Sequence, residues 1–461
     1  MFLWRFLLMK TNMMRCLPST GPVRKHAAKV ISCPAISTKP VGRSNGDTMN
    51  EFRAGFARTD ITPAAGMPVH GYFEPRYVSG VLDPIYADVL ALSCGESSAL
   101  LISMDLCEVC EDVMLPLRQR ISAETDIPVE AILIAATHNH TGPCVLSEAH
   151  AKGFTMFGVP FEEEKLQLLR DYRLALEEKL LAAAVSALQD LQPASLSCGT
   201  AECEGVSFVR RYRMKDGRIR TNPGIGNPDI VESLGKADTQ MCALQLKRQS
   251  DTILLAHFGN HADTVGGNQI SADWPGIMRS EVENARPKTH CMFFNGGEGN
   301  INHFDAQLTN PEYQAYLQEN RDIMAAARYC GKKCAQAVLQ ALENASAVAA
   351  SEIRFKGLCF DYPTKSGEEN IYMTLCGIAI GDVALIGIPG EPFAETAIAL
   401  KRAGGWRMVL PCSLCNGFLD YFSTMDALDG SSYEAQSCRF IPGIAEKIEE
   451  KGKDLLAQLK V

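Results

Sequence analysis

The sequence predicts an α/β fold in which layered, mixed β-sheets are flanked by helices. Short, largely apolar runs at 99–104 and 131–136 are typical of strands that are buried on both faces of a sheet. The segment 111–121 between them repeats apolar residues at helical spacing. Neither an internal repeat nor a low-complexity linker follows residue 49. We therefore expect one continuous domain over 49–461.

The remaining elements continue this alternation of strands and helices. The longest predicted helix covers 163–188, and its leucines fall on one side: Leu166, Leu169, Leu176, Leu180 and Leu188. Further strands are expected at 252–258, 291–295, 352–359 and 371–388, and further helices at 274–285, 311–344, 391–403 and 441–459. Ligands of such sheets bind where loops leave the carboxyl ends of strands. Polar residues directly after apolar runs are therefore the candidates for a functional site.

The formal net charge of −9 is unevenly distributed along the chain. Residues 1–48 contain eight Lys and Arg but a single acid, Asp47, so the rest of the chain carries about −16. A body of that charge does not attract phosphate, which excludes an ordinary nucleic-acid binder. No run approaches the roughly 18 apolar residues of a transmembrane helix, so none is predicted.

Residues 1–48 do not resemble part of a folded domain. They are rich in Arg, Lys, Ser, Thr and Pro and nearly free of acids, which is the composition of an organelle transit peptide. Alternatively the natural start is Met49, which directly precedes the first segment that looks folded. Both interpretations stay open. We expect a cytoplasmic protein, with an organelle as the alternative if 1–48 is a targeting segment.

The seventeen cysteines are scattered along the chain. Several lie within or beside apolar runs: Cys198, Cys242, Cys291 and Cys376. This placement is typical of buried free thiols in a reducing compartment. Two CxxC pairs, Cys107–Cys110 and Cys412–Cys415, could together hold a structural zinc ion. Each pair follows an apolar strand-like run and lacks a Gly-rich knuckle, so we interpret both as ordinary thiols.

Two pairs of histidines follow or end predicted strands. His138 and His140 come directly after the run 131–136, and residues two apart on an extended chain point to the same side. Imidazole is the commonest neutral metal ligand and also moves protons near neutral pH. His257 and His261 form the second pair, and spacing alone does not decide which of them would join His138. His257 lies within a predicted strand and is more readily explained as a core residue.

Three further polar residues follow predicted strands but have ordinary explanations. Glu298 lies in the Gly-rich turn 293–302, where glycine permits a ligand to approach the backbone closely, although most such turns only reverse the chain. Glu391 falls in the first turn of a predicted helix, where the helix dipole alone favours a carboxylate. Tyr421 follows the apolar pair Val409–Leu410, and no pattern singles it out.

The order of these motifs over roughly residues 52–440 resembles the N-terminal catalytic domain of the neutral (alkaline, non-lysosomal) ceramidases, in their bacterial-type branch. The segments that carry the resemblance, besides the motifs at Glu298, Glu391 and Tyr421, are Gly55-Phe-Ala-Arg-Thr-Asp-Ile-Thr-Pro63, Gly71-Tyr72, Asp83-Pro-Ile-Tyr-Ala87, Ser103-Met-Asp-Leu106, Thr137-His-Asn-His-Thr-Gly-Pro143 and Val209-Arg-Arg-Tyr212. The resemblance implies a zinc hydrolase domain over 49–461.

The resemblance also implies which residues hold the zinc ion. The family's ligands are the first His of a His-x-His motif, a later His, the Glu after Pro-Gly, and a Tyr in an Asn-x-x-x-x-Tyr segment. At the matching positions stand His138, His261, Glu391 and Tyr421. Water activated by the zinc would cleave a linear N-acyl amide bond. His140 would then act on the substrate or on the water.

The same resemblance implies partners for that chemistry. Asp105, Asp263 or Glu298 would take up and return a proton, or orient a ligand histidine. Ceramidases carry a Gly-Asp-Val-Ser-Pro-Asn segment, and the matching stretch here places Asn300 at the serine and Glu298 at the aspartate. Asparagine is not a nucleophile, but it can donate a hydrogen bond to an oxyanion. Asn300 is therefore counted with His140, Glu298 and Asp105 as a candidate catalytic residue.

The exchange at Asn300 and the lack of a C-terminal immunoglobulin-like domain argue against ceramide as the substrate. We expect a small-molecule or lipid amide, smaller and more polar than ceramide, contacted by Arg210 or Arg211. Two alternatives stay open. One is a metal-dependent esterase, lactonase or other enzyme acting on a polar carbonyl compound. The other is a non-catalytic metal-binding homologue, although all four implied ligands are retained.

Overall fold

A computed structural model describes residues 51–72, 74–147, 155–156, 159–367, 370–428 and 431–460. These residues belong to one unit of the chain, Ser44–Val461. The predicted segment 1–48 lies outside the described residues.

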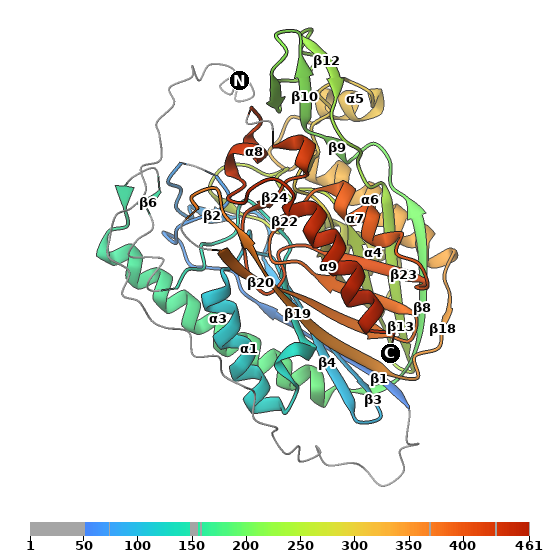
Figure 1. The fold of residues 1–461 in the computed structure, drawn as a ribbon. Helices are drawn as coiled ribbons and strands as arrows, with labels where there is room; N and C mark the ends of the chain where they lie inside the picture. Colours follow the sequence, from blue (N-terminus) through green and yellow to red (C-terminus); the bar gives the residue numbers. More distant parts are fainter. Residues whose placement is uncertain are drawn as a thin grey trace. The chain divides into compact units, whose positions relative to one another are not determined.

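The larger of two main sheets has nine strands (Figure 1). Their order is β16 (Thr289–Asn295), β14 (Thr252–Phe258), β13 (Gln240–Arg248), β8 (Gln192–Glu202), β1 (Phe52–Asp60), β3 (Tyr86–Cys94), β4 (Ser97–Met104) and β5 (Ile132–Ala136), with β18 (Ser346–Val348) also paired to β8. The pairs β4–β5 and β14–β16 are parallel. The other strands of this sheet pair antiparallel.

The smaller main sheet has four strands in the order β19 (Ile353–Pro363), β20 (Asn370–Ile380), β21 (Val383–Gly387) and β23 (Met408–Cys412). Only β21 and β23 in this sheet run parallel. Together the two sheets therefore contain three parallel pairs, whose carboxyl ends supply most of the candidate site residues.

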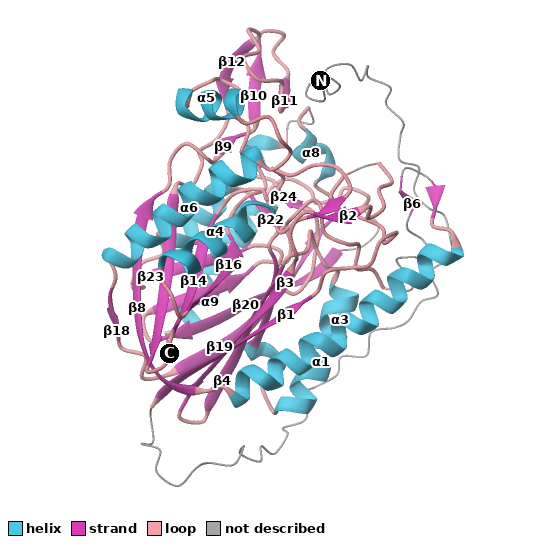
Figure 2. Cartoon of the chain, turned by 180° about the vertical axis from the view of Figure 1, so that it is seen from behind, coloured by secondary structure: helices cyan, strands magenta, loops and turns pink. Residues whose placement is uncertain are grey.

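Helices cover the outer faces of both sheets. Figure 2 shows α3 (Glu163–Gln189), α4 (Asp273–Ala285) and α6 (Ala325–Glu343) across the larger sheet, with α1 (Glu111–Thr125) beside α3. Figure 1 shows α9 (Ile444–Gln458) and α7 (Ala394–Lys401) in front of the smaller sheet. The predicted architecture of layered mixed sheets flanked by helices is confirmed.

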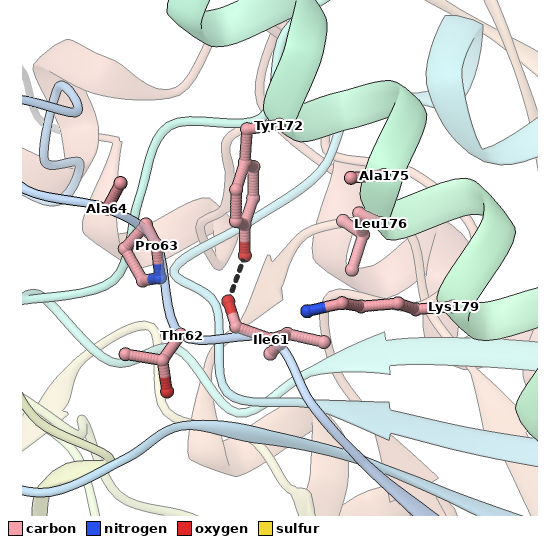
Figure 3. Close-up of a pocket in the computed structure, with 8 residues that line it drawn as sticks. All are labelled: Ile61, Thr62, Pro63, Ala64, Tyr172, Ala175, Leu176 and Lys179. Carbon is pink, nitrogen blue, oxygen red and sulfur yellow. Dashed lines mark hydrogen bonds between the residues drawn. The ribbon is translucent and has the colours of Figure 1, made fainter.

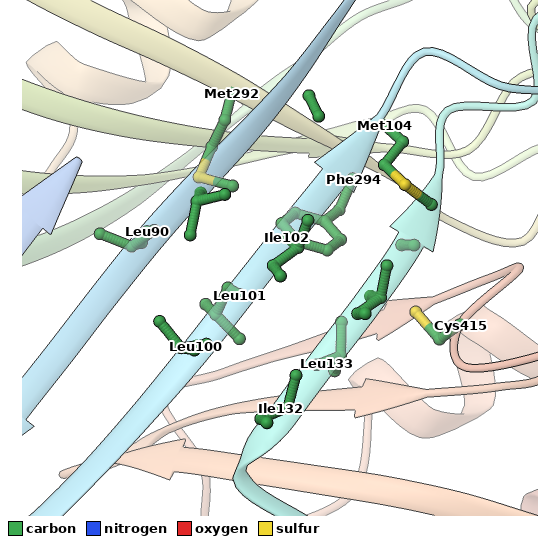
Figure 4. Packing of buried hydrophobic residues seen from close by; sticks show 14 of the residues in the cluster. Leu90, Leu100, Leu101, Ile102, Met104, Ile132, Leu133, Met292, Phe294 and Cys415 are labelled. Atoms are coloured by element: carbon green, nitrogen blue, oxygen red, sulfur yellow. The ribbon is translucent and has the colours of Figure 1, made fainter. Parts of the chain in front are cut away.

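The two sheets face each other across the largest apolar core, which Figure 4 shows at β4, β5 and β16. Leu100, Leu101 and Ile102 are all 0% exposed. Because neighbours on a strand point to opposite faces, burial of all three means that both faces of β4 are covered. The prediction of doubly buried strands is confirmed here.

Two glycines let helices lie directly on the larger sheet. A Cβ on Gly55 in β1 would come 2.0 Å from the carbonyl oxygen of Ala187 in α3. A Cβ on Gly199 in β8 would come equally close to the carbonyl oxygen of Ala341 in α6. Real Cβ atoms do not approach an oxygen so closely, so any other residue at either position would push its helix away from the sheet.

Two predicted elements are each divided in the structure. The predicted strand 371–388 is two antiparallel strands, β20 and β21, joined by a tight turn at Gly381, whose φ is +57°. The predicted helix 311–344 is α5 (Pro311–Glu319) and α6, separated by a turn in which Asp322 accepts a hydrogen bond from the Met324 amide (3.0 Å). Local hydrogen bonding of this kind competes with helix continuation, and apolar periodicity does not report it.

The remaining elements are short. They are β2 (Gly80–Val81), β6 (Thr155–Met156), β7 (Val159–Pro160), β9 (Phe208–Val209), β10 (Arg211–Met214), β11 (Ile219–Thr221), β12 (Ile230–Ser233), β15 (Gln269–Ile270), β17 (Ile301–Asn302), β22 (Glu391–Pro392), β24 (Tyr421–Phe422), α8 (Tyr433–Ser437), and the 3₁₀ turns Val129–Ala131 and Met425–Ala427. Strands β10, β11 and β12 form a small sheet that projects near α5 (Figures 1 and 2).

Within the described ranges, no helix has the length and apolar character to cross a membrane. The cysteines of both CxxC pairs and the four predicted buried thiols are unpaired. Cys198, Cys242, Cys291 and Cys376 are all buried, as predicted.

Candidate metal centre

Loops that leave three parallel strands bring the implied metal ligands together. His138 follows β5, His261 follows β14 and Glu391 follows β21. The ligand atoms of these three residues lie within 4.8 Å of one another, and all three side chains are buried. Tyr421 joins them through the short parallel pair β22–β24, in which it is the direct partner of Glu391.

Polar atoms of His138, His261 and Glu391 face one another at this centre. Nε2 of His138 lies 3.2 Å from Nε2 of His261. Oε2 of Glu391 lies 3.5 Å from each of these nitrogens. This oxygen is buried and has no hydrogen-bond partner. Such an atom carries a large desolvation cost unless a cation or a proton compensates it.

Two backbone carbonyls fix which ring nitrogen of each histidine faces the centre. Nδ1 of His138 lies 2.9 Å from the carbonyl oxygen of Cys107, and Nδ1 of His261 lies 3.0 Å from that of Glu298. A carbonyl oxygen only accepts, so both Nδ1 atoms must donate, and both Nε2 atoms are left with lone pairs. Two imidazole lone pairs and a carboxylate oxygen in contact are a donor set for a divalent cation.

The electrostatics of the metal-free centre agree with this description. Burial lowers the pKa of His138, but interactions with Glu391 and Cys107 together outweigh burial and raise that pKa well above its usual value. Burial and the charges of Arg210 and His138 hold the pKa of His261 well below its usual value. A proton or a cation at Nε2 of His138 would balance the charge of Glu391.

The backbone of His138 is itself unusual. Its φ is +71°, in the left-handed region that residues with a side chain rarely adopt. Such strain persists only where surrounding contacts hold it, and it is concentrated at functional sites. Here the contacts include the His138 amide, which donates to the carbonyl of Leu106 at 2.9 Å.

Arg210 lies at the edge of the centre. Its Nη1 is 3.2 Å from Nε2 of His261, and its guanidinium lies over the Tyr421 ring at 5.5 Å. Nε donates to Glu434 at 2.7 Å, and Nη2 donates to the carbonyl of Gly299 at 2.8 Å. This leaves Nη1 directed at the place where the ligand atoms meet. Burial alone would lower the pKa of Arg210, but Tyr421 and Glu434 raise it, so the guanidinium stays charged.

Arg211 does not share this position. Its guanidinium lies over the Phe393 ring at 5.4 Å, and its Nη2 donates to the carbonyl of Ala427 at 3.5 Å. Its nearest approach to a carboxylate is 4.0 Å, to Glu434. Of the two arginines predicted to contact substrate, the structure brings only Arg210 to the metal centre.

His140 lies beside the centre without being one of its three closest ligands. Its Nε2 is 3.3 Å from Nε2 of His138, while its buried Nδ1 has no hydrogen-bond partner and lies 3.7 Å from Oδ1 of Asp263. Tyr72 donates its hydroxyl proton to the same Asp263 oxygen. Gly71 makes this packing possible, because a Cβ there would lie 2.7 Å from Cα of His140.

Glu298 is buried next to the ligands. Both of its carboxylate oxygens lack a hydrogen-bond partner. Burial raises its pKa from 4.5 to about 8, and the negative charge of Glu391 adds to that shift. In the metal-free protein this carboxyl therefore holds a proton at neutral pH. The backbone carbonyl of Glu298 orients the ring of His261, whereas the Glu298 side chain makes no hydrogen bond to a ligand histidine.

Two of the predicted catalytic residues are engaged elsewhere. Asp105 accepts hydrogen bonds from Arg279 (2.5 Å) and from the Tyr86 amide (2.9 Å), so its lone pairs serve a buried ion-pair network and orient no ligand histidine. Asn300 donates to Glu395 (2.9 Å) and accepts from the Ala394 amide (3.0 Å) at the start of α7. The expected roles of Asp105 as a base and of Asn300 as an oxyanion donor are not supported by these contacts.

Sequence reasoning left other residues unassigned. His257 is a buried core residue, as its position within a strand suggested, and its Nε2 donates to the carbonyl of Pro411 at 2.8 Å. Tyr72 lies in a segment that carried the family resemblance, but nothing marked it as a site residue. Nothing in the sequence pointed to Glu434, because its contact with Arg210 joins positions more than two hundred residues apart.

A separate pocket of about 170 Å³ lies between the end of β1 and α3 (Figure 3). Its polar groups are already engaged: Tyr172 donates to the carbonyl of Ile61 at 2.6 Å, and Lys179 donates to that of Asp60 at 2.7 Å. None of its lining residues belongs to the metal centre. We assign it no function.

Comparison with solved structures identifies the fold. Neutral ceramidase from Pseudomonas aeruginosa is 17% identical, with a TM-score of 0.69, over 89% of this chain and 75% of that one. A second structure, a ceramidase complexed with C2, is 16% identical with the same TM-score and the same coverage. No protein-family model matches the sequence, and no curated protein does. The chain thus has the fold of neutral ceramidase, which confirms structurally the resemblance that its motifs carry.

Proposed function

We propose that this protein is a zinc-dependent hydrolase that cleaves a linear N-acyl amide. The observation that carries the proposal is the buried meeting of Nε2 of His138, Nε2 of His261 and the unpartnered Oε2 of Glu391. Tyr421, adjacent to Glu391, is the fourth proposed ligand. The ceramidase fold supports amide hydrolysis as the reaction, since the structures of similar fold are ceramidases.

Zinc bound to two histidines and a carboxylate supplies a Lewis acid and lowers the pKa of a bound water to about 7. The protein's own groups would do the rest. The charged Nη1 of Arg210 faces the centre and would orient the carbonyl oxygen of the substrate. Glu434 and the carbonyl of Gly299 hold that guanidinium in place.

Two groups are placed to move protons. Nδ1 of His140 is buried, lacks a hydrogen-bond partner and faces Asp263, so it could pass a proton to or from that carboxylate. Glu298 is the second group, because both of its oxygens are free and it lies close enough to Glu391 and His138 to feel their charges. We favour these two residues over Asp105 and Asn300.

The burial of the centre favours a substrate that presents a slender end to it. His138, His261 and Glu391 are 1–2% exposed, and Arg210 is 6% exposed. Arg210 and Tyr421 offer polar contacts around the reacting bond. We therefore propose a linear amide that is more polar than ceramide. An ester or lactone carbonyl would fit the same donors, and this remains the second candidate because the donors contact only the carbonyl group.

The experiment combines metal analysis with a substrate panel. Purified protein should contain zinc, and it should hydrolyse members of a panel of N-acyl amides. His261→Ala should lose both zinc and turnover. His290→Ala is the matched control, since His290 lies outside the centre with a 42% exposed side chain and should keep both.

The panel also separates the alternatives. Turnover of esters or lactones with no amide hydrolysis would replace the first proposal by the second. Zinc binding without turnover of any carbonyl substrate would favour the non-catalytic homologue. Full activity of His261→Ala would contradict the ligand assignment.

A further inference from the structure

We propose that His70, Cys107 and Glu108 form a second cation site, next to the first but separate from it. Ligand atoms of these three residues lie within 4.8 Å of one another. They come from two segments, the loop before Gly71 and the loop between β4 and α1. This site does not depend on the proposed function, because none of its three residues is a ligand of the first centre.

The distances within this group fit a bridging cation better than direct contacts. Nε2 of His70 lies 3.8 Å from Oε1 of Glu108, which is beyond hydrogen-bonding distance. Sγ of Cys107 lies 3.9 Å from Nδ1 of His138, and the proton on that nitrogen already goes to the Cys107 carbonyl at 2.9 Å. The thiol is therefore not needed to satisfy His138. A cation among the three side chains would replace the long ion pair between His70 and Glu108 and the long thiol contact of Cys107 by direct ligand bonds.

The donor set indicates the kind of ion. One thiolate, one imidazole and one carboxylate match the ligands of zinc and of similar borderline-soft divalent cations. Hard cations such as magnesium and calcium prefer a shell made of oxygen atoms. Cys107 is 2% exposed, whereas the side chains of His70 and Glu108 are each 16% exposed. A fourth ligand would thus approach from the side of His70 and Glu108, which is the more exposed, and water there would complete a tetrahedron.

The surrounding backbone holds the three donors in place. The His70 amide donates to the carbonyl of Gly142 at 2.9 Å, and Arg76 donates to the His70 carbonyl. Cys107 is held through its own carbonyl, which accepts from His138. The second site therefore shares a hydrogen bond with the first: Cys107 would bind one cation through sulfur and orient a ligand of the other through oxygen. Contacts of this type tune metal affinity by about 10- to 100-fold.

Cobalt replacement distinguishes the two sites, because the four ligands proposed for the first, His138, His261, Glu391 and Tyr421, include no sulfur. The full-length protein loaded with Co²⁺ should show thiolate-to-cobalt charge-transfer absorption, and zinc loading should reach about two equivalents per chain. Cys107→Ala should remove the absorption and about one equivalent of metal. Cys110→Ala, three residues away in the same loop and outside the group, should remove neither.

Two further variants protect this test against a folding defect. His70→Ala and Glu108→Gln leave the thiol in place and should weaken Co²⁺ binding, measured by titration, by at least about 10-fold. The proposal is overturned if the wild-type protein shows no thiolate absorption, or if the absorption survives Cys107→Ala. Loss of zinc from His261→Ala with the thiolate absorption intact would support two independent sites. A failure of the proposed hydrolysis would leave this spectrum unchanged.

Discussion

Two buried polar clusters lie close together in this fold and differ in how their charges are balanced. The first, the arginine network, comprises Arg58, Asp88, Arg279 and Asp105. Arg58 contacts Asp88 at 2.6 Å, and Arg279 contacts Asp88 at 3.4 Å and Asp105 at 2.5 Å. Every charge has an opposite charge beside it. The second cluster is the candidate metal centre, where Oε2 of Glu391 has no hydrogen-bond partner and faces two imidazole nitrogens, although Nη1 of Arg210 lies 3.2 Å from one of them, Nε2 of His261.

This difference separates a structural cluster from a functional one. Except for Arg58, whose side chain is 25% exposed, both clusters are buried, and both contain residues that follow apolar strands, Asp105 after β4 and His138 after β5. The arginine network is complete without a ligand. The metal centre is complete only with a cation or an added proton. Buried charge alone is therefore a poor indicator of function, whereas buried lone pairs that are left facing one another are a good one.

The largest effect on stability is expected in the arginine network. Arg279→Met leaves Asp105, which is 0% exposed, without its cationic partner, whereas Asp88 keeps Arg58. Breaking a buried ion pair on one side costs about 3–5 kcal/mol of the free energy of unfolding. Denaturant unfolding would measure the loss. Zinc content per folded molecule should not change.

The control for this variant is Arg407→Met, whose partner Asp382 is 46% exposed at the side chain. An exposed pair contributes about 0–1 kcal/mol, so this variant should be nearly neutral. If Arg279→Met instead emptied the metal centre while the fold survived, the two clusters would be one coupled unit, and the distinction between them would be wrong.

The next largest effect is expected on turnover, from a change at the edge of the metal centre. Glu434→Gln removes the charge that holds Nε of Arg210. The guanidinium would then be less firmly directed at His261, and turnover should fall by about 10- to 100-fold, as for other residues that orient a metal site. Zinc content should be retained, because Glu434 is not a ligand. Thr221→Val is a milder comparison, since its hydroxyl donates to the other Glu434 oxygen at 2.6 Å.

The pH dependence of stability tests the same difference between the two clusters. Folding raises the pKa of Glu298 from 4.5 to about 8, so the folded metal-free protein keeps a proton that the unfolded chain has lost in this window. The free energy of unfolding should therefore fall as pH rises from 4.5 to about 8. Asp263, whose pKa burial raises to about 7, acts in the same direction. Thermal unfolding in the presence of a chelator would measure this slope.

Glu298→Gln should flatten that slope, because the titrating group is gone. Bound zinc should reduce it as well, since a nearby cation favours the ionised carboxylate. An unchanged slope in Glu298→Gln would mean that Glu298 titrates normally and is not part of the unbalanced cluster.

The sequence predicted much of the fold because apolar periodicity reports burial directly. The doubly buried runs at β4 and β5 and the long helix α3 follow from it. It also pointed to His138 and His140, which come directly after β5. Glu391 and Tyr421 had ordinary explanations until the family resemblance selected them, and their pairing across β22–β24 is a tertiary contact. Nothing in the sequence indicated the partner of Asp105, because Arg279 lies on α4, far along the chain.

The smallest effect is expected where the sequence departs from the ceramidase pattern. Asn300→Ser would introduce the serine that the resemblance places at this position, and a direct catalytic role for this position predicts a large change in turnover. The contacts predict otherwise, since Asn300 accepts from the Ala394 amide (3.0 Å) and donates to Glu395 (2.9 Å). These bonds secure the start of α7, and losing such a cap costs about 1 kcal/mol. We therefore expect a slightly lower melting temperature and unchanged amide turnover. A rise in activity toward long-chain lipid amides would instead show that this position selects the substrate, and that Asn300 belongs to the metal centre rather than to its supporting structure.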